Sequence, residues 1–324
     1  MTDAQNMNSN TQLQQIDIAA ADDFVLTELA GIVDVLRVAN RVRGRPLFTW
    51  KYVSLHGGPI TSSGGASIQT EAFSNHPEAA YLFALGNENS ENPGLALGPV
   101  INRYRSRQTR IILLSEAASR HIADGSSGTE NYTTHWENRA VLLEQLGLFE
   151  TGAALAVDDG QIVTAAGMGA TVDVTLSIVA PHLSAAAMST VTDILLHERM
   201  RHFNTLQPYA GRAVLSTGDA DLDACISLMQ EHIEAPLPIA KIASQAKVSK
   251  RSIERKFQSI LHTTPNGYYR ELRLSQANNL LLNTSMSIQE IGLAVGFSSG
   301  FSRVYKTVFG MTPFEARQKP QRNE

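Results

Sequence analysis

The chain has 324 residues, a formal net charge of -4 and one cysteine, Cys225. This length is enough for two domains with separate cores, and no apolar run reaches the roughly 20 residues of a membrane-spanning helix. A lone cysteine excludes an intramolecular disulfide framework and a cysteine-clustered metal site. The charge is uneven, because residues 219–324 hold 13 Lys and Arg against 10 Asp and Glu, while the remainder holds 14 against 21. A basic C-terminal end suits DNA binding confined to that end.

Residues 1–15 are polar and rich in Asn and Gln. They lack the apolar core of a signal peptide, and a segment of this composition buries too little apolar surface to fold. We therefore predict a disordered tail over 1–15 and a cytoplasmic protein.

From residue 16 to residue 206, short apolar runs alternate with segments of helical period. The predicted strands are Gln15–Ala20, Phe48–Leu55, Tyr81–Leu85, Arg110–Leu114, Leu155–Val157 and Ile162–Thr164. The predicted helices are Leu29–Arg43, Pro99–Arg105, Trp136–Leu146, Thr171–Ala180 and Ala185–Phe203. This alternation predicts an α/β domain over 16–206 with an open, largely parallel sheet.

Residues 207–218 have weak periodicity and contain one proline and two glycines, which predicts a linker. No convincing strand pattern follows, so we expect an all-helical domain over 219–324. The signals for helix starts are the acidic residues that open Asp219–Ile233, the prolines Pro265 and Pro313, and the capping-box spacing of Ser287 and Glu290.

Two helix-turn-helix units follow one another in this domain, over 239–257 and 287–306. Each pairs a short apolar helix with a second helix that carries a basic face. In DNA-binding units of this kind the second helix enters the major groove. Two ordinary solvated helix faces are the alternative. A tandem pair joined by a long helix, with an aromatic-rich turn and Thr-Pro after each unit, favours DNA binding instead.

The outward faces of the two second helices supply the candidate DNA contacts. We expect Ser249 to cap the first of them, so that its first turn reaches base edges. Arginine can bind guanine through two hydrogen bonds, and lysine more often contacts phosphate. The predicted DNA-binding residues are Ser249, Lys250, Arg251, Ser252, Arg255 and Gln258 in the first helix, and Ser299, Ser302, Arg303 and Lys306 in the second.

Several short motifs of this domain form a specific signature. They are Ile253-Glu254-Arg255-Lys256-Phe257, Thr264-Pro265, Tyr268–Arg273 with Ala277, Gly296-Phe297, Phe301-Ser302-Arg303 and Phe309-Gly310-Met311-Thr312-Pro313. On these motifs, residues 219–319 resemble the DNA-binding domain of AraC/XylS-type regulators. Only Ser298-Ser299-Gly300 separate the Gly-Phe pair from Phe-Ser-Arg, where the family usually has a longer spacer. We therefore expect the second recognition helix to start late or to lack part of its first turn.

A second set of motifs lies in the α/β domain. They are Asp34-Val35-Leu36-Arg37-Val38-Ala39-Asn40, Trp50-Lys51-Tyr52-Val53-Ser54, Thr133-Thr134-His135-Trp136-Glu137, Val157-Asp158-Asp159-Gly160 and Ala165-Ala166-Gly167. On these, the domain resembles the PfpI-like, class I glutamine amidotransferase-like domain of GlxA-type regulators, which implies a flavodoxin-like sheet. Enzymes of that superfamily use a cysteine on a strand-to-helix elbow, a nearby Glu and often a His. The matching positions here are Ser115, Glu28 and His135.

A Ser, Glu and His set is compatible with nucleophilic catalysis, so an amidase-like hydrolase is the alternative function. Three features oppose it. A serine hydroxyl needs a stronger base than a thiol does. Glu116 puts a bulky anion beside the elbow, where a small residue is needed. The turn at Gly86-Asn87-Glu88 carries a carboxylate where an oxyanion should be stabilised. We therefore predict no catalytic residues.

Open α/β sheets bind ligands at the carboxyl ends of their strands. The residues that we expect to cluster there are Glu28, Asn87, Ser115, Glu116 and His135. Two or three carboxylates beside a histidine favour a cationic or amine-bearing ligand, and the resemblance implies the same, because several GlxA-type relatives sense nitrogen compounds. The alternative is that these are satisfied polar groups at the sheet ends. Histidine spacing gives no metal-binding motif, so neither a metal nor a cofactor is predicted.

Together these features predict a transcription regulator without enzymatic activity, in which an N-terminal sensor domain controls a C-terminal DNA-binding domain. The predicted partners are promoter DNA, a small-molecule effector and a second copy of the chain bound through the N-terminal domain, with RNA polymerase as a candidate and no membrane. The alternative is an amidase-like hydrolase with an attached DNA-binding domain. An architectural DNA binder would leave more than half of the chain unexplained.

Overall fold

The computed structural model describes residues 13–125, 132–138, 142, 154–207 and 217–318. The chain separates into two compact units, Met1–Thr205 and Leu206–Glu324. Most of the tail predicted over 1–15 and of the linker predicted over 207–218 lies outside the described residues. Residues 14 and 15 already belong to the first strand. No helix in the described ranges is long and apolar enough to cross a membrane.

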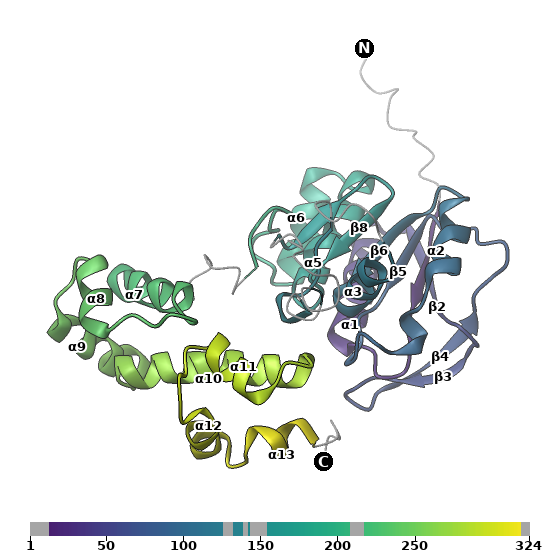
Figure 1. The fold of residues 1–324 in the computed structure, drawn as a ribbon. Helices are drawn as coiled ribbons and strands as arrows, with labels where there is room; N and C mark the ends of the chain where they lie inside the picture. Colours follow the sequence, from purple (N-terminus) through teal and green to yellow (C-terminus); the bar gives the residue numbers. More distant parts are fainter. Residues whose placement is uncertain (1–12, 126–131, 139–141, 143–153, 208–216, 319–324) are drawn as a thin grey trace, which may run out of the picture. The chain divides into compact units, whose positions relative to one another are not determined.

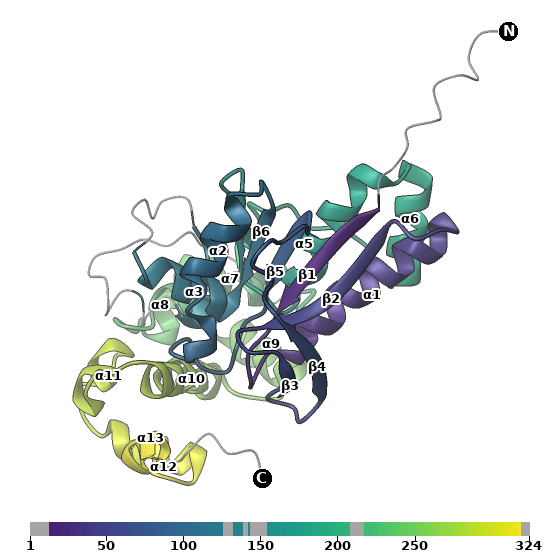
Figure 2. The same ribbon diagram turned by 90° about the vertical axis from the view of Figure 1, so that its right-hand side faces the viewer.

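The first unit is built on an eight-stranded sheet with the order β3-β4-β2-β1-β5-β6-β8-β7 (Figures 1 and 2). The strands are β1 (Gln14–Ala19), β2 (Phe48–Ser54), β3 (Gly58–Thr61), β4 (Ser67–Ala72), β5 (Tyr81–Ala84), β6 (Arg110–Leu114), β7 (Ala156–Asp158) and β8 (Ile162–Ala165). The two edge pairs, β3–β4 and β7–β8, are antiparallel, and the other described pairs are parallel. The central order β2-β1-β5-β6-β8 is flavodoxin-like, with its switch point between β1 and β5. The predicted fold class is confirmed.

Helices cover both faces of the sheet (Figure 2). On one face lie α1 (Leu26–Arg43), α5 (Ala170–Val179) and α6 (Ala185–Ile194), and on the other α2 (Gly98–Arg105) and α3 (Ser115–Ala123). Successive strand residues point to opposite faces, so Ile18 belongs to the core under α1, α5 and α6, and Ala19 belongs to the core under α2 and α3. Because both faces are buried, β5, β6 and β8 are largely continuous apolar runs, and their bounds match the prediction within a residue or two.

Two described parts of this unit differ from the predictions through weak local signals. The strands β3 and β4 were not predicted, because Ile60 and Thr70 are their only buried residues and the alternation is therefore faint. The helix α3 was not predicted either. Of the helix predicted over Trp136–Leu146, the structure describes a 3-10 turn at Trp136–Asn138 and the residue Leu142, and the rest lies outside the described residues.

The helix predicted over Ala185–Phe203 is wrong beyond Ile194, where α6 ends. Its termination follows from a buried carboxylate on α5. Asp173 is 2% exposed and accepts hydrogen bonds from the Arg201 guanidinium at 2.9 Å (Nε) and 2.7 Å (Nη2), and His197 Nε2 lies 2.9 Å from it. Leu196 turns the chain with a left-handed φ of 52°. The segment after Ile194 thus pairs with Asp173 through His197 and Arg201, and it does not continue α6.

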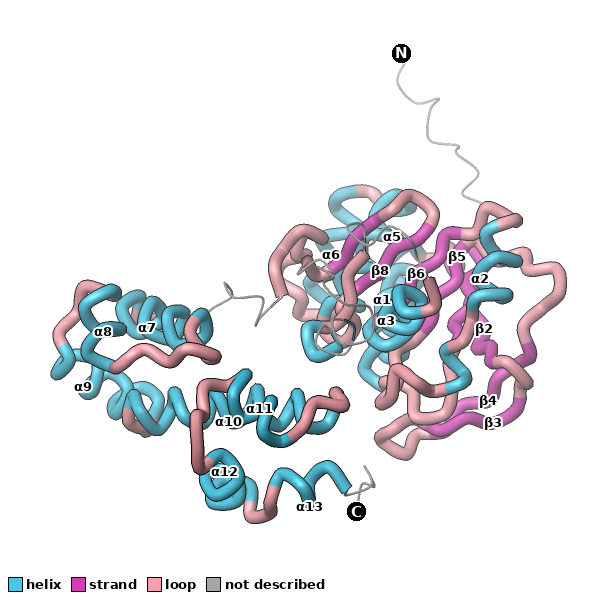
Figure 3. The backbone as a smooth tube through the Cα atoms, in the orientation of Figure 1, coloured by secondary structure: helices cyan, strands magenta, loops and turns pink. Residues whose placement is uncertain are grey.

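The second unit is helical between its loops over 217–318 (Figure 3). Its helices are α7 (Ala220–Glu231), α8 (Ile239–Gln245), α9 (Lys250–Leu261), α10 (Pro265–Asn283), α11 (Ile288–Ala294), α12 (Phe301–Phe309) and α13 (Pro313–Gln318). The predicted caps are confirmed: the Ser249 hydroxyl accepts from the amide of Ser252, and Ser287 and Glu290 form a capping box. Such caps depend only on residues three apart, so the sequence reveals them.

The long helix α10 packs against both helix-turn-helix units. At its start, the Tyr268 ring meets Phe257 of α9 with 5.4 Å between centroids. One to two turns later, Arg273 donates hydrogen bonds of 2.7 Å to the carbonyls of Val295 and Gly296, in the turn after α11. A single helix, α10, therefore sets the spacing between the two helix-turn-helix units.

The pairing of Arg201 with Asp173 predicts a local stability effect. Arg201→Met leaves a buried carboxylate without its main partner, and we expect the first unit to lose about 3 kcal/mol of unfolding free energy. The matched control is Arg37→Met, whose pair with Asp34 is exposed and is expected to contribute less than about 1 kcal/mol. Urea denaturation followed by tryptophan fluorescence measures this unit alone, because Trp50 and Trp136 are the chain's two tryptophans. Equal losses in the two variants would contradict the prediction.

Candidate functional site

A buried carboxylate lies at the centre of the polar cluster beyond the carboxyl ends of the strands. Glu28, in the first turn of α1, is 0% exposed. Its Oε1 accepts hydrogen bonds from the hydroxyl of Ser115 and, at 3.1 Å, from the amide of Met168. Its Oε2 accepts from the amide of Gly86 at 2.6 Å. One side chain therefore joins the chain segments that follow β1, β5, β6 and β8, beside the switch point of the sheet.

The environment of Glu28 favours its protonated form. Desolvation by burial raises its pKa, and the charge of Glu116 adds to that shift. Hydrogen bonds from Ser115, Gly86 and Met168 act in the opposite direction, and the resulting pKa is about 7. The carboxyl is therefore about half protonated near neutral pH.

Ser115 occupies the elbow expected of a nucleophile. It follows β6 and begins α3 with a φ of 37°, a conformation that non-glycine residues rarely adopt. The approach of Ser115 to Glu28 requires glycine on both sides. A Cβ at Gly86 would lie 2.5 Å from the Ser115 hydroxyl, and a Cβ at Gly167 would collide with both Ser115 and Glu28. The predicted approach of Ser115 to Glu28 is present, and the backbone at Gly86 and Gly167 packs tightly against this pair.

A second carboxylate, on α3, lies against the turn that follows β5. Glu116 is half-buried; its Oε2 accepts from the amide of Asn87 at 3.0 Å, and its Oε1 accepts from the Asn138 side chain at 3.0 Å. We expected Glu88 to place a carboxylate in this turn, but the Glu88 side chain is exposed. Glu116 therefore supplies the negative charge at this turn.

The other two predicted ligand residues are directed elsewhere. The Asn87 side chain donates to the carbonyl of Asp22 at 2.6 Å, so only the backbone amide of Asn87 faces the cluster. His135 Nδ1 lies 3.3 Å from the Glu137 carboxylate, and its ring packs against Trp136 at 5.5 Å. Among the described contacts of His135, none is with Ser115 or Glu28. The structure thus brings together Glu28, Ser115 and Glu116 and leaves His135 outside.

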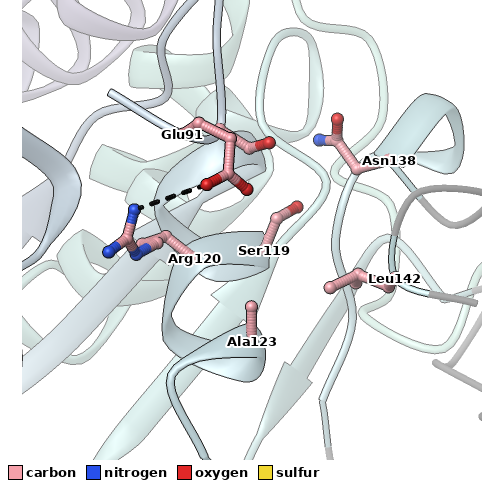
Figure 4. A pocket seen from close by; sticks show the side chains of 7 residues that line it. Glu91, Ser119, Arg120, Ala123, Asn138 and Leu142 are labelled. Atoms are coloured by element: carbon pink, nitrogen blue, oxygen red, sulfur yellow. Dashed lines mark ion pairs between the residues drawn. The ribbon is translucent and has the colours of Figure 1, made fainter. Parts of the chain in front are cut away.

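A small hollow lies one helical turn along α3 from Ser115 (Figure 4). The residues that line it are Ser90, Glu91, Ser119, Arg120, Ala123, Asn138 and Leu142. Its volume of 10 Å³ is room for about one water molecule. The hydroxyls of Ser119 and Thr134 lie 2.6 Å apart, and Thr134 donates to the carbonyl of Ser115 at 2.7 Å, which connects the hollow to the elbow.

Three residues of the cluster were missed by sequence reasoning. Met168 contributes a backbone amide from a turn with a φ of 47°, and Asn138 and Thr134 contribute side chains. A backbone donor carries no signal in the residue type. The Ala165-Ala166-Gly167 turn is among the motifs of this domain, and Gly167 is one of the two glycines that allow the close approach.

In the second unit, α9 presents the expected outward face. Lys250, Arg251, Arg255 and Gln258 are exposed, and Ser252 is half-buried. The opposite side packs into the core through Ile253 and Phe257. The four side chains are therefore free of the core and available to DNA.

The second recognition helix differs from the first. α12 has 9 residues where α9 has 12, and it begins at Phe301, whose ring is buried. Gly300 precedes it with a φ of 73° and provides no side-chain cap. Ser299 lies before the helix, while Ser302, Arg303 and Lys306 are exposed on it. Its first turn thus begins with a buried aromatic side chain and lacks the side-chain cap that Ser249 gives α9.

Comparison with known proteins agrees with this arrangement. The helix-turn-helix domain family matches residues 242–319. The HTH-type transcriptional regulator GbdR of Pseudomonas aeruginosa is 29% identical over 95% of this chain and 85% of its own length. The regulator GlxA of Rhizobium meliloti is 29% identical over 96% of this chain and 98% of its own, and the regulator ArgR of Pseudomonas aeruginosa is 30% identical over 88% and 87%.

The chain therefore belongs to the GlxA-type branch of the AraC-family HTH-type transcriptional regulators. It is a DNA-binding transcription regulator with an AraC-type helix-turn-helix domain.

The raised pKa of Glu28 predicts a pH-dependent stability of the first unit. The protonated form is favoured in the folded state, so the stabilising contribution is fully present below about pH 4.5 and is lost as the pH rises through about 7. The loss is on the order of 3 kcal/mol. Glu28→Gln should flatten this dependence, and Glu88→Gln, which changes an exposed carboxylate, should retain it. Urea denaturation followed by tryptophan fluorescence at several pH values measures both. A slope that persists in Glu28→Gln would assign the titration to another group.

The unequal recognition helices predict unequal effects on sequence choice. Arg251→Ala or Arg255→Ala should each relax specificity at one position by about 1–3 kcal/mol, the size of a guanine contact. Arg303→Ala should relax it less, because α12 is the shorter helix and its first turn has no side-chain cap. Selection of binding sites from random duplexes by the three variants tests this. The prediction fails if Arg303→Ala loses the most specificity.

Proposed function

We propose that the first unit is a catalytically inactive amidotransferase-like sensor, which binds a small amine-bearing effector and thereby controls DNA binding by the second unit. The observation that carries the proposal is that two backbone amides have carboxylates as their hydrogen-bond partners. In the turn after β5, Gly86 donates to Glu28 and Asn87 donates to Glu116. Amides in such a turn are the groups that would stabilise an oxyanion, and here both meet carboxylates.

Hydrolysis by Ser115 would place a further negative oxygen in this turn, beside Glu116 and the partly ionised Glu28. Like charges a few ångströms apart repel strongly in a site shielded from water, and about 1.4 kcal/mol corresponds to a tenfold change in rate. The half-buried Glu116 is the carboxylate most affected, because it lies directly after the elbow. Binding without turnover is the function that this arrangement favours.

The preference for a cationic effector rests on charge. Glu28 is buried and about half protonated near neutrality, so Glu116 is the carboxylate that a ligand at this edge would meet, with the exposed Glu91 nearby. Arg120 is paired with Asp124 at 2.9 Å and also lies 4.0 Å from Glu91, so Glu116 is the carboxylate on which the preference rests. An ammonium group would gain charge-assisted hydrogen bonds here, whereas an anion would be repelled.

The alternative is an amidase-like hydrolase with an attached DNA-binding domain, and one observation favours it. Ser115 is on a strained elbow with its hydroxyl bonded to Glu28, a carboxyl whose pKa of about 7 suits a general base. His135 lies outside this pair, so the hydrolase would have to operate with Glu28 alone.

On the DNA side, we propose that the promoter is contacted by the ten residues of the two recognition helices named above. Homodimerisation through the first unit would place two such domains on paired half-sites. RNA polymerase is a candidate further partner, and a cytoplasmic location fits a regulator of promoters.

Calorimetric titration and hydrolysis assays with the full-length protein test this proposal together. A panel of amines should bind, carboxylates of similar size should not, and Glu116→Gln should weaken amine binding about tenfold or more. Glu88→Gln is the matched control and should bind like the wild type. Esters and amides should show no turnover that depends on Ser115. Turnover abolished by Ser115→Ala would establish the hydrolase, and binding restricted to anions would reject the charge preference.

A further inference from the structure

The basic side chains of the first recognition helix do not share one environment. Lys250, Arg251 and Arg255 are exposed, whereas the Lys256 side chain is 18% exposed and turns towards α7. The Lys256 ammonium donates to the carboxylates of Asp219 at 2.6 Å and Asp221 at 2.7 Å. The hydrogen bond to Asp219 raises the pKa of Lys256, so the ammonium stays charged at neutral pH. This lysine has two partners within the protein.

Asp219 also holds the start of α7. Its Oδ1 caps that helix by accepting from the amides of Asp221 at 3.1 Å and Leu222 at 3.0 Å, and the same atom accepts from Lys256. One turn along, the carboxylate of Asp223 accepts from the amide and hydroxyl of Thr217 at 2.8 and 2.7 Å. The segment through which the chain enters the second unit is thus bonded to the recognition helix.

The position of Lys256 on α9 gives this bond a geometric consequence. Neighbouring residues of a helix point about 100° apart, so Lys256 lies between the buried Phe257 and the exposed Arg255. The apolar contacts of α9 with α7, through Phe257 and Ile253, resist separation of the two helices. A directional ion pair beside them adds a constraint on the rotation of α9 about its own axis, and the directions of Arg251 and Arg255 depend on that rotation.

We propose that Lys256 is a positioning residue for DNA reading, which holds the first recognition helix against the entry segment and makes no contact with phosphate. Its ammonium also offsets part of the negative charge of Asp219 and Asp221, two carboxylates of a unit that binds a polyanion. The inference rests on the proposed DNA contacts of α9 and is independent of the proposed effector site.

The first test separates positioning from phosphate contact. Each neutralised phosphate contributes about 0.9 to the slope of log affinity against log salt. In the full-length protein, Lys250→Met should lower this slope by about 0.9 if the exposed ammonium contacts phosphate. Lys256→Met should weaken binding to a selected duplex about tenfold and reduce its preference over a mismatched duplex, with the slope unchanged. A slope that falls by about 0.9 in Lys256→Met would make it a phosphate contact and overturn the proposal.

The second test uses the opposite signs of two effects. Asp219→Asn with Asp221→Asn removes two negative charges, which by charge alone should strengthen DNA binding. Asparagine caps helices as well as aspartate does, so α7 should keep its start. The proposal expects weaker binding and reduced preference, as in Lys256→Met, and no further loss when all three substitutions are combined. Tighter binding by the double variant, or wild-type affinity in the triple variant, would mean that Lys256 acts only by neutralising charge.

Rescue by a conservative change distinguishes positioning from general destabilisation. Lys256→Arg retains a charged donor and should recover most of the affinity and the preference for the selected duplex. Helical circular dichroism and thermal melting of each variant control for folding. If Lys256→Met fails to fold, the doubly substituted Asp219 and Asp221 variant carries the test alone. Lost preference in a variant that melts like the wild type supports positioning, and retained preference there overturns it.

Discussion

The arrangement of the first unit depends on burying one carboxyl group where four chain segments meet. An ionised carboxylate without water needs hydrogen bonds, and Glu28 takes them from Ser115 and from the amides of Gly86 and Met168. These donors follow β6, β5 and β8, while Glu28 itself follows β1. Glycine at positions 86 and 167 is the steric condition for their approach. Any change in the protonation or contacts of Glu28 must therefore act on all four segments together.

The same geometry is compatible with hydrolysis or with binding, and the proposal of binding rests on the surrounding hydrogen bonds. An elbow serine with a neighbouring carboxyl of raised pKa is a catalytic arrangement in isolation. Catalysis also needs donors that are free at the moment when negative charge develops. The amides of Gly86 and Asn87 already have carboxylate partners in this chain. Fold resemblance alone does not separate the two functions, and the carboxylate partners of these two amides are what supports the proposal of binding without turnover.

Sequence reasoning succeeded where the controlling interaction is local and failed where it is distant. The caps at Ser249 and Ser287 were predicted because each involves residues three apart. The end of α6 was missed because it depends on Asp173, which meets its partner Arg201 only in the folded chain. His135 was assigned to the cluster from its spacing after Ser115, but spacing along a chain does not fix direction, and its ring turns to Glu137 and Trp136.

Control of DNA binding by an effector requires that the two ligands favour different states of one chain. The described residues that flank 208–216 show where the connection is bonded to each unit. Before it, Arg201 is bonded to α5, the helix that begins just after the turn whose Met168 amide meets Glu28. After it, Thr217 is bonded to α7. Each unit therefore holds its own end of the connection by a side-chain hydrogen bond, Arg201 to Asp173 in the first and Thr217 to Asp223 in the second, and a change within either unit reaches the connection through that bond.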